Sequence, residues 1–317
     1  MRWATGRLVG AVLTLFGVAV VVFIVLRVIP GDTITASLGI ESGTLTDTQR
    51  ASLEHYYGLD QPLVVQFFSW IGQVLQGNLG VSLVSGKSAG GLIVDALPVT
   101  VELAVLATII GSVIGVLMGM LAASAPGKLR DGASQAVALL GLSVPEFVLG
   151  AVVVAVLAQA FGYFPDTGTF VPITTSVQGN LSQMMYPALV LAVGFAANVM
   201  RTTRSSYMEV ADADFARTAL GKGLTGRRIR FRHVLRNASV PIVTITGIQF
   251  GYLLGGTVII EQIFALPGLG RLLFTSITNR DYPLVQSSVL VIAGGFVLVN
   301  LVVDLLYRVI DPRTRAT

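Results

Sequence analysis

The sequence of 317 residues has no cysteine, only two histidines, and charged side chains at just 12% of its positions. The absence of cysteine excludes disulfides, thiolate catalysis and cysteine-ligated metal sites. His55 and His233 lie far apart and have no metal-ligand spacing, so each is interpreted as an ordinary polar residue. Soluble domains carry about a quarter of their residues as Asp, Glu, Lys and Arg. A chain with 53% hydrophobic residues and a mean hydropathy of +0.78 has too little charge for a soluble surface, and is predicted to be an integral membrane protein.

What the sequence has instead is long apolar runs. A bilayer core about 30 Å thick needs about 20 apolar residues per helix. We expect spans at about 8–29, 101–124, 134–161, 181–203, 239–262 and 284–308, with an outside loop at 30–98 and a cytoplasmic loop at 204–238. Runs of this length exclude an outer-membrane barrel. The predicted fold class is therefore all-α, with six transmembrane helices in one domain covering residues 1–317.

The basic residues predict which side each loop faces. Lys and Arg are enriched in cytoplasmic loops, and sixteen of them fall on one side of the predicted spans against four, Arg50, Lys87, Arg271 and Arg280, on the other. Nine of the sixteen lie in one connection: Arg201, Arg204, Arg217, Lys222, Arg227, Arg228, Arg230, Arg232 and Arg236. Both termini are therefore expected in the cytoplasm.

The outside loop is long enough to have structure of its own. Thr46 and Gln49 have the spacing of a capping box, which predicts a short helix ending near Gly58. Pro62 suits a first helical position, and apolar residues at helical spacing follow it from Leu63 to Val74. This second stretch is too short to span a bilayer, so we expect a helix at the membrane surface or against a partner.

Gly86-Lys87-Ser88 has the ending of a phosphate-binding loop but not its beginning. The pattern requires a glycine at position 81, which is Val81. No other stretch offers a glycine-rich cradle for phosphate. If ATP drives a transport process here, the ATPase is expected on another polypeptide.

The basic connection at 201–239 is expected to form two short helices around a break. Residues 207–220 have high helix propensity with acidic side chains near the amino end, Gly221 and Gly223 interrupt them, and Thr225 can cap a second helix. A loop that only sets topology and contacts lipid head groups is one interpretation. Docking of a cytoplasmic partner is the other, and the acidic-then-basic order favours it.

Part of this connection resembles the coupling loop of ABC importer permeases. That loop reads Glu-Ala-Ala, three residues, Gly, nine residues and Ile-x-Leu-Pro. The corresponding positions here are Arg217-Thr218-Ala219, Gly223 and His233-Val234-Leu235-Arg236. The spacing is kept, while the Glu, the first Ala, the Ile and the Pro are replaced. The replacements resemble the peptide and nickel importer branch of the family.

Other motifs of that branch follow in order along almost the whole chain. They are RVIPGD at 27–32, YGLDQPL at 57–63, GNLG at 77–80, LPVTVEL at 97–103, FALPGLGR at 264–271, RDYP at 280–283 and DPR at 311–313. The long outside loop makes the chain similar to the B-type permease of a dipeptide or oligopeptide importer rather than to its C-type partner.

The resemblance implies a type I importer in which this chain forms half of a pathway for peptides. The implied partners are a C-type permease, two cytoplasmic ATPase subunits, an external substrate-binding protein and the lipid bilayer, with no nucleic acid. The chain itself is implied to be non-catalytic and to bind no cofactor, because ATP and Mg²⁺ belong to the ATPases. The implied location is a bacterial or archaeal cytoplasmic membrane. The implied coupling residues are Asp214, Phe215, Arg217, Thr218, Ala219, Lys222, Gly223 and Leu224.

Polar residues within the predicted spans are candidates for the pathway. Glu146 lies near the middle of the third span, where a charge costs about 2.5–3.5 kcal/mol. It follows Pro145, which is expected to kink the helix. A cavity-facing acid that meets the amino group of a peptide is one interpretation, and an acid in an inter-helix contact is the other. Asn198 and Gln249 are weaker candidates, because buried amides commonly bind neighbouring helices.

Two other function classes are less well supported. A stand-alone secondary transporter needs its own ion site, preferably in related halves, and only Glu146 lies deep in a span. A membrane-embedded enzyme needs a nucleophile–base pair or a metal site, and the sequence suggests neither. Within the importer class, nickel chelates, heme-like ligands and other small solutes stand as alternatives to peptides.

Overall fold

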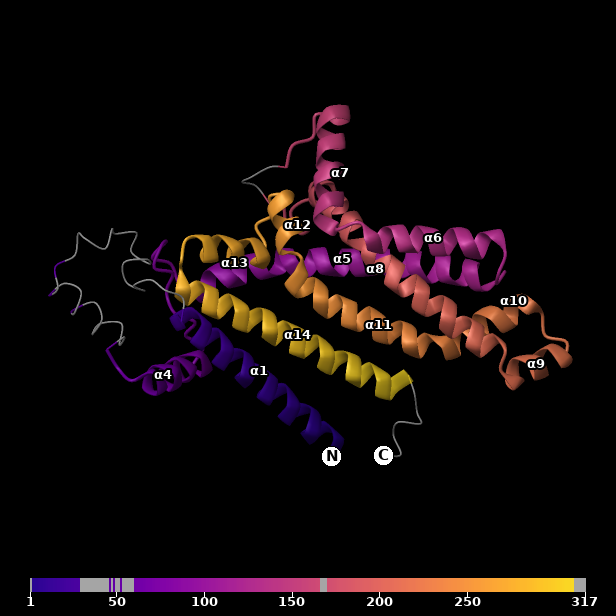
Figure 1. The fold of residues 1–317 in the computed structure, drawn as a ribbon, viewed down its shortest axis with the longest axis horizontal. Helices are drawn as coiled ribbons and strands as arrows, with labels where there is room; N and C mark the ends of the chain where they lie inside the picture. Colours follow the sequence, from indigo (N-terminus) through magenta and orange to yellow (C-terminus); the bar gives the residue numbers. More distant parts are fainter. Residues whose placement is uncertain are drawn as a thin grey trace. The chain divides into compact units, whose positions relative to one another are not determined.

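A computed structural model describes residues 2–28, 46, 48, 52, 60–165 and 170–310 (Figure 1). The capping box expected at Thr46 and Gln49 lies outside the described residues, since Gln49 and most of its neighbours are not among them. The described part of the chain is built from helices. They are α1 (Arg2–Val28), α4 (Leu63–Leu75), α5 (Ala89–Ala123), α6 (Leu129–Ser143), α7 (Glu146–Phe161), α8 (Val177–Ala211), α9 (Asp214–Gly221), α10 (Gly226–Arg228), the π-helix η1 (Ile229–Val234), α11 (Leu235–Gly256), α12 (Val258–Ile263), α13 (Leu269–Thr278) and α14 (Tyr282–Ile310).

Within the described ranges, five helical stretches are long and apolar enough to cross a membrane. They are Thr5–Val28, Ala89–Ala123, Val177–Ala211, Arg232–Gly255 and Tyr282–Leu305. A sixth span results if α6 and α7 are counted together. These two helices meet at an angle of 93°.

The bend between α6 and α7 occurs at Pro145, where a kink was predicted from the sequence. α6 ends at Ser143, and Pro145, with φ −59° and ψ 136°, caps the start of α7. A proline within a helix removes one backbone hydrogen bond and kinks the helix. Here the extended backbone of Val144 and Pro145 divides the segment into two helices, so the change of direction is larger than a kink.

The described chain divides into two compact units, each with its own core. The first comprises residues 1–100 and 267–297, and the second comprises 101–266 and 298–317. In the first unit, Phe67 of α4 packs edge-to-face on Phe23 of α1, with 5.2 Å between ring centroids. Trp70 and Ile71 join this cluster. The apolar stripe predicted after Pro62 is therefore the face that α4 packs on α1.

The segment from Gly80 to Ala89, which contains Gly86-Lys87-Ser88, is a closed turn in the first unit. Ser82 N donates to the Lys87 carbonyl and Gly86 N donates to the Ser82 carbonyl, each at 2.9 Å. Asp281 accepts hydrogen bonds from the Ser82 hydroxyl and the Leu83 amide. Since the Gly86 amide is occupied within the turn, the segment does not have the form of a phosphate-binding loop.

The second unit is organised around α8. Helices α6 and α11 pack against it (Figure 1), and α5 approaches it through a row of glycines. A Cβ added to Gly115 would lie 2.7 Å from the Ala196 carbonyl oxygen, and one added to Gly119 would lie 2.6 Å from Thr203 Cβ. Glycine allows helix backbones to approach this closely in membrane proteins. The absence of side chains on this face of α5 therefore determines how α5 and α8 pack.

Candidate functional site

The predicted coupling residues lie on and directly after the short helix α9. Thr218 Oγ1 donates to the Asp214 carbonyl at 2.9 Å within this helix. The exposed side chains define what we call the coupling surface: Asp214, Phe215, Arg217, Thr218 and Lys222. Phe215, 41% exposed, is a large apolar side chain on this polar surface. A polar rim around an exposed aromatic is typical of a protein–protein contact.

The expected helix at 207–220 is divided in the structure. α8 extends through Tyr207 to Ala211, and α9 begins only at Asp214. The hydrogen bond from Asp212 N to the Met208 carbonyl is of the α-helical type, and Asp212 is the C-cap residue of α8. The expectation of one helix over 207–220 was therefore wrong. Only two residues separate the end of the long helix α8 from the start of α9, which carries the coupling surface.

Ala219 attaches α9 to the rest of the second unit. It is 9% exposed and packs in a cluster with Ala123 at the end of α5, Tyr207 of α8, and Ile229 and Val234 of η1. Small side chains allow close packing between helices. Ala219 therefore belongs to the inner face of α9, whereas its neighbours Arg217 and Thr218 face outward.

Gly223 ends α9 through its backbone conformation. Its φ is +78°, and a Cβ added there would meet no atom within 4 Å. Leu224 N donates to the Ala219 carbonyl at 3.2 Å, and Leu224 packs on the Ala219 cluster. This is a helix C-terminus of the Schellman type, with the left-handed residue at its usual glycine position. Glycine at position 223 therefore serves the tight turn, since no described atom approaches it closely.

The second half of the loop is joined to the next span without a break. Thr225 precedes α10, as expected, although its side chain makes no capping hydrogen bond. Helices α10, η1 and α11 follow one another directly, and Pro241 lies inside α11. π-helical turns are rare and occur frequently at functional sites. Here the π-turn lies beside α9 and contributes Ile229 and Val234 to its packing.

Two of the predicted pathway residues, Glu146 and Asn198, each lie near Gly194 of α8. Glu146 begins α7, and a Cβ added to Gly194 would lie 3.3 Å from Glu146 Oε1. Asn198, one turn further along α8, donates from Nδ2 to the Gly194 carbonyl at 3.2 Å. The bend between α6 and α7 therefore places the carboxylate beside α8.

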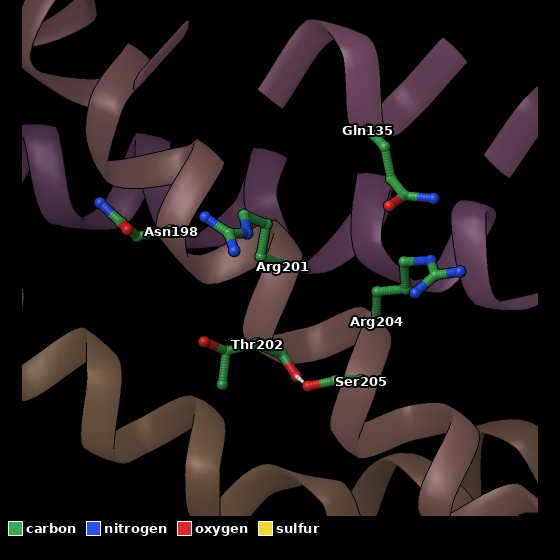
Figure 2. Close-up of a pocket in the computed structure, with 6 residues that line it drawn as sticks. All are labelled: Gln135, Asn198, Arg201, Thr202, Arg204 and Ser205. Carbon is green, nitrogen blue, oxygen red and sulfur yellow. Dashed lines mark hydrogen bonds between the residues drawn. The ribbon is translucent and has the colours of Figure 1, made fainter. Parts of the chain in front are cut away.

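A polar pocket of about 400 Å³ opens further along α8 (Figure 2). Its lining residues are Gln135 of α6 and Asn198, Arg201, Thr202, Arg204 and Ser205 of α8. Ser205 Oγ donates to the Thr202 carbonyl at 3.3 Å, as the dashed line in Figure 2 marks. Gln249, the third predicted pathway residue, is half-buried on α11 and does not line this pocket.

An ion pair forms one wall of the pocket. Arg204 donates from Nε to Asp131 Oδ1 at 2.6 Å and from Nη2 to Oδ2 at 2.8 Å. Gly127 N and Gln135 Nε2 also donate to the Asp131 carboxylate, each at 2.9 Å. The carboxylate is 3% exposed. Two parallel hydrogen bonds between a guanidinium and a carboxylate fix the orientation of both groups and are stronger than hydrogen bonds between neutral groups. We call this set of contacts the Asp131–Arg204 clamp, since it ties the start of α6 to α8.

Neither the clamp nor the pocket is predicted by the sequence patterns. From the sequence, Arg201 and Arg204 are two of the nine basic residues of the predicted cytoplasmic connection. A signal was nevertheless present, because Asn198, Arg201, Thr202 and Ser205 have the spacing of one helical face. Among the described residues, no group of three His, Cys, Asp or Glu side chains could hold a metal ion.

Comparison with known proteins finds relatives along nearly the whole chain. Residues 115–316 match the family described as "Binding-protein-dependent transport system inner membrane component", and residues 1–104 match the N-terminal domain of such membrane components. The chain is 38% identical, over 98% of its length and 97% of the relative's, to "Probable peptide ABC transporter permease protein y4tP" of Sinorhizobium fredii. It is 36% identical, over 99% of each chain, to the glutathione transport system permease protein GsiC of Escherichia coli.

A solved structure supports the fold. A chain from the crystal structure of an amino acid ABC transporter with histidines matches with a TM-score of 0.53. The match covers 69% of this chain and 94% of that chain at 18% sequence identity. This likeness, together with the helices described above, confirms the predicted all-α fold of an ABC importer permease.

Proposed function

Because the chain belongs to the family of binding-protein-dependent transport system inner membrane components, we propose that it is the permease subunit of an ATP-driven peptide importer. The observation that carries the proposal is sequence identity of 36–38% over nearly the full length of relatives named as peptide and glutathione permeases. Peptides and glutathione share amide backbones and free carboxylates. Di- or oligopeptides are therefore the substrate class we assign to this chain.

The proposed role of this chain is to form part of the pathway and to change its access. Two ATPase subunits outside this chain bind ATP and Mg²⁺, and the coupling surface of α9 docks on one of them. Their closure moves α9, and because two residues join α9 to α8, the movement reaches the helix that carries the polar pocket. Coupling of this kind links two distinct sites through a change between two arrangements.

The other partners follow from the family description. A binding-protein-dependent system has an external protein that delivers the substrate. We propose that the second half of the pathway is a different, C-type permease, and that the complex resides in a bacterial or archaeal cytoplasmic membrane. The termini and the basic connection at 201–239 are then on the cytoplasmic side, together with the ATPases.

The test is reconstitution of the complete complex in proteoliposomes. ATP-dependent uptake of a labelled dipeptide in the presence of the binding protein is the expected result. A complex whose ATPase subunits cannot hydrolyse ATP is the control and is expected to give no uptake. Uptake of a nickel chelate but of no peptide would overturn the substrate assignment. Uptake by this chain without any ATPase would overturn the assignment to an ATP-driven importer.

A further inference from the structure

The polar pocket on α8 occupies one continuous face of that helix. Asn198, Arg201, Thr202 and Ser205 lie three or four residues apart, the spacing that places side chains on one side of an α-helix. The residues between them, Val199, Met200 and Thr203, are fully buried. α8 therefore has a packed face, turned toward the rest of the second unit, and a polar face that lines the pocket.

The pocket has an excess of positive charge. The guanidinium of Arg204 is neutralised by Asp131, which it contacts at 2.6 and 2.8 Å. Arg201 is exposed, and no residue in the described ranges forms an ion pair or hydrogen bond with its side chain. One full positive charge is thus presented to the pocket beside the Asn198 amide and the hydroxyls of Thr202 and Ser205.

The chemistry of the lining distinguishes the pocket from the lipid-facing surface. All six lining side chains are polar, whereas exposed positions on the neighbouring helices α5 and α6 include Ile109, Val113, Leu117 and Leu139. The pocket lies where α8 enters the basic connection, and Arg201 and Ser205 are exposed there, so the pocket is interpreted as open to water.

We infer that this pocket binds the carboxylate of the transported peptide, with Arg201 as the residue that receives it. The inference rests on the proposed function. A guanidinium presents a planar fork of donors that matches a carboxylate bidentately. Asn198 uses one amide hydrogen on the Gly194 carbonyl and retains a second for a ligand. A volume of about 400 Å³ accommodates a small peptide end rather than a single ion.

The Asp131–Arg204 clamp neutralises one of the two guanidiniums that line the pocket. Asp131 accepts hydrogen bonds from Nε and Nη2 of Arg204, so the charge of Arg204 is already neutralised. The site therefore carries a single strong anion-binding group, and this matches a substrate whose one carboxylate is released after transport. A site with two free guanidiniums would hold such an anion more tightly and would slow its release.

The test measures peptide binding directly. The complete complex is reconstituted in phosphatidylcholine nanodiscs without the binding protein, and binding of a labelled dipeptide and of its C-terminal amide is measured by equilibrium dialysis. The wild-type complex is expected to bind the free acid about tenfold more tightly than the amide, which corresponds to one charge-assisted contact. Arg201→Gln is expected to weaken binding of the free acid about tenfold and to leave binding of the amide unchanged.

Two further variants serve as comparison and control. Arg201→Lys keeps the charge but loses the planar fork, so intermediate affinity for the free acid is expected. Arg130→Gln removes an exposed guanidinium from the start of α6, outside the pocket, and is expected to bind both ligands as the wild type does. Elution of each variant complex as the wild-type assembly in size-exclusion chromatography establishes that the complex is intact.

The outcomes separate this inference from the proposed function. An equal effect of Arg201→Gln on acid and amide, or no effect on either, would overturn the carboxylate site. A difference between variant and wild type that appears only when phosphatidylglycerol is added to the nanodiscs would assign the pocket to a lipid phosphate instead. Failure of the wild-type complex to bind the dipeptide would also overturn the inference. Failure of ATP-dependent uptake with the binding protein present would overturn the proposed function itself.

Discussion

Gly223 has a structural role that follows from its backbone conformation: it forms the turn after α9. Gly223 has a φ of +78°, and a Cβ added to it would meet no atom within 4 Å. The position therefore requires a residue that tolerates a left-handed backbone, although there is room for a side chain. A left-handed conformation costs a residue with a Cβ roughly 1–2 kcal/mol, and Asn tolerates it better than branched residues do. The local geometry of the α9 terminus therefore predicts a graded response to substitution.

We expect Gly223→Val to lower the ratio of peptide transported to ATP hydrolysed, and Gly223→Asn to retain most of it. The valine strains the turn that directs Leu224 back onto Ala219, which displaces the coupling surface. The measurement is uptake and ATPase rate on the same proteoliposomes. Gly221→Ala, at a position with ordinary φ and no atom within 4 Å, is the matched control and should behave as the wild type. A valine variant with normal coupling would show that the turn is not required.

At the scale of secondary-structure elements, the Asp131–Arg204 clamp joins α6 to α8. Asp131→Asn keeps the shape of the side chain but leaves the partly buried Arg204 without its counter-charge. Breaking one half of such a pair costs about 2–3 kcal/mol, less than for a fully buried pair because Arg204 is 24% exposed. The expected result is a lower thermal midpoint of the detergent-purified protein.

The double variant Asp131→Asn/Arg204→Gln removes both charges and should recover part of the lost stability. Asp212→Asn alters an exposed carboxylate at the end of α8, and a change within about 0.5 kcal/mol is expected for this control. If Asp131→Asn were as stable as the wild type, the clamp would contribute nothing to the packing of α6 on α8.

The close approach of α5 to α8 at Gly115 and Gly119 leads to a second prediction at the scale of secondary-structure elements. Gly115→Leu introduces a side chain where even a Cβ would lie 2.7 Å from the Ala196 carbonyl oxygen. Overpacking of this kind costs about 1–3 kcal/mol, so the thermal midpoint and the yield of membrane-inserted protein should both fall. Gly17→Ala, on α1 with no atom within 4 Å of an added Cβ, should leave both unchanged. An unaltered Gly115→Leu protein would contradict close α5–α8 packing.

At the scale of the whole molecule, the absence of cysteine allows a direct measurement of orientation. Lys87→Cys and Arg228→Cys each introduce one exposed thiol, and the wild-type chain is an unlabelled control. A membrane-impermeant maleimide should label Cys at 87 in right-side-out vesicles and Cys at 228 only in inverted vesicles. The excess of basic residues on one side of the spans is the physical reason for this expectation. The reverse labelling pattern would overturn the proposed orientation.

Local features account for the parts of the fold that the sequence predicts well. The positions of the apolar runs depend on composition, and the bend after α6 depends on Pro145. The division of 207–220 into α8 and α9 was not predicted, because helix propensity is similar on both sides of Asp212 and gives no boundary there. For the candidate site, the spacing of Arg217, Ala219 and Gly223 indicated the coupling segment. It did not indicate that Ala219 packs inward while Arg217 is exposed.

The sequence by itself determined that this chain is a polytopic helical membrane protein of the importer permease family, because long apolar runs and ordered motifs are properties of contiguous residues. The tertiary structure decided how the polar groups are paired. Asp131 and Arg204 are 73 residues apart, and Glu146, at the 93° bend between α6 and α7, lies beside Gly194 of α8. No periodicity relates such residues. Which of the two guanidiniums that line the pocket is neutralised by a described carboxylate is therefore a consequence of helix packing.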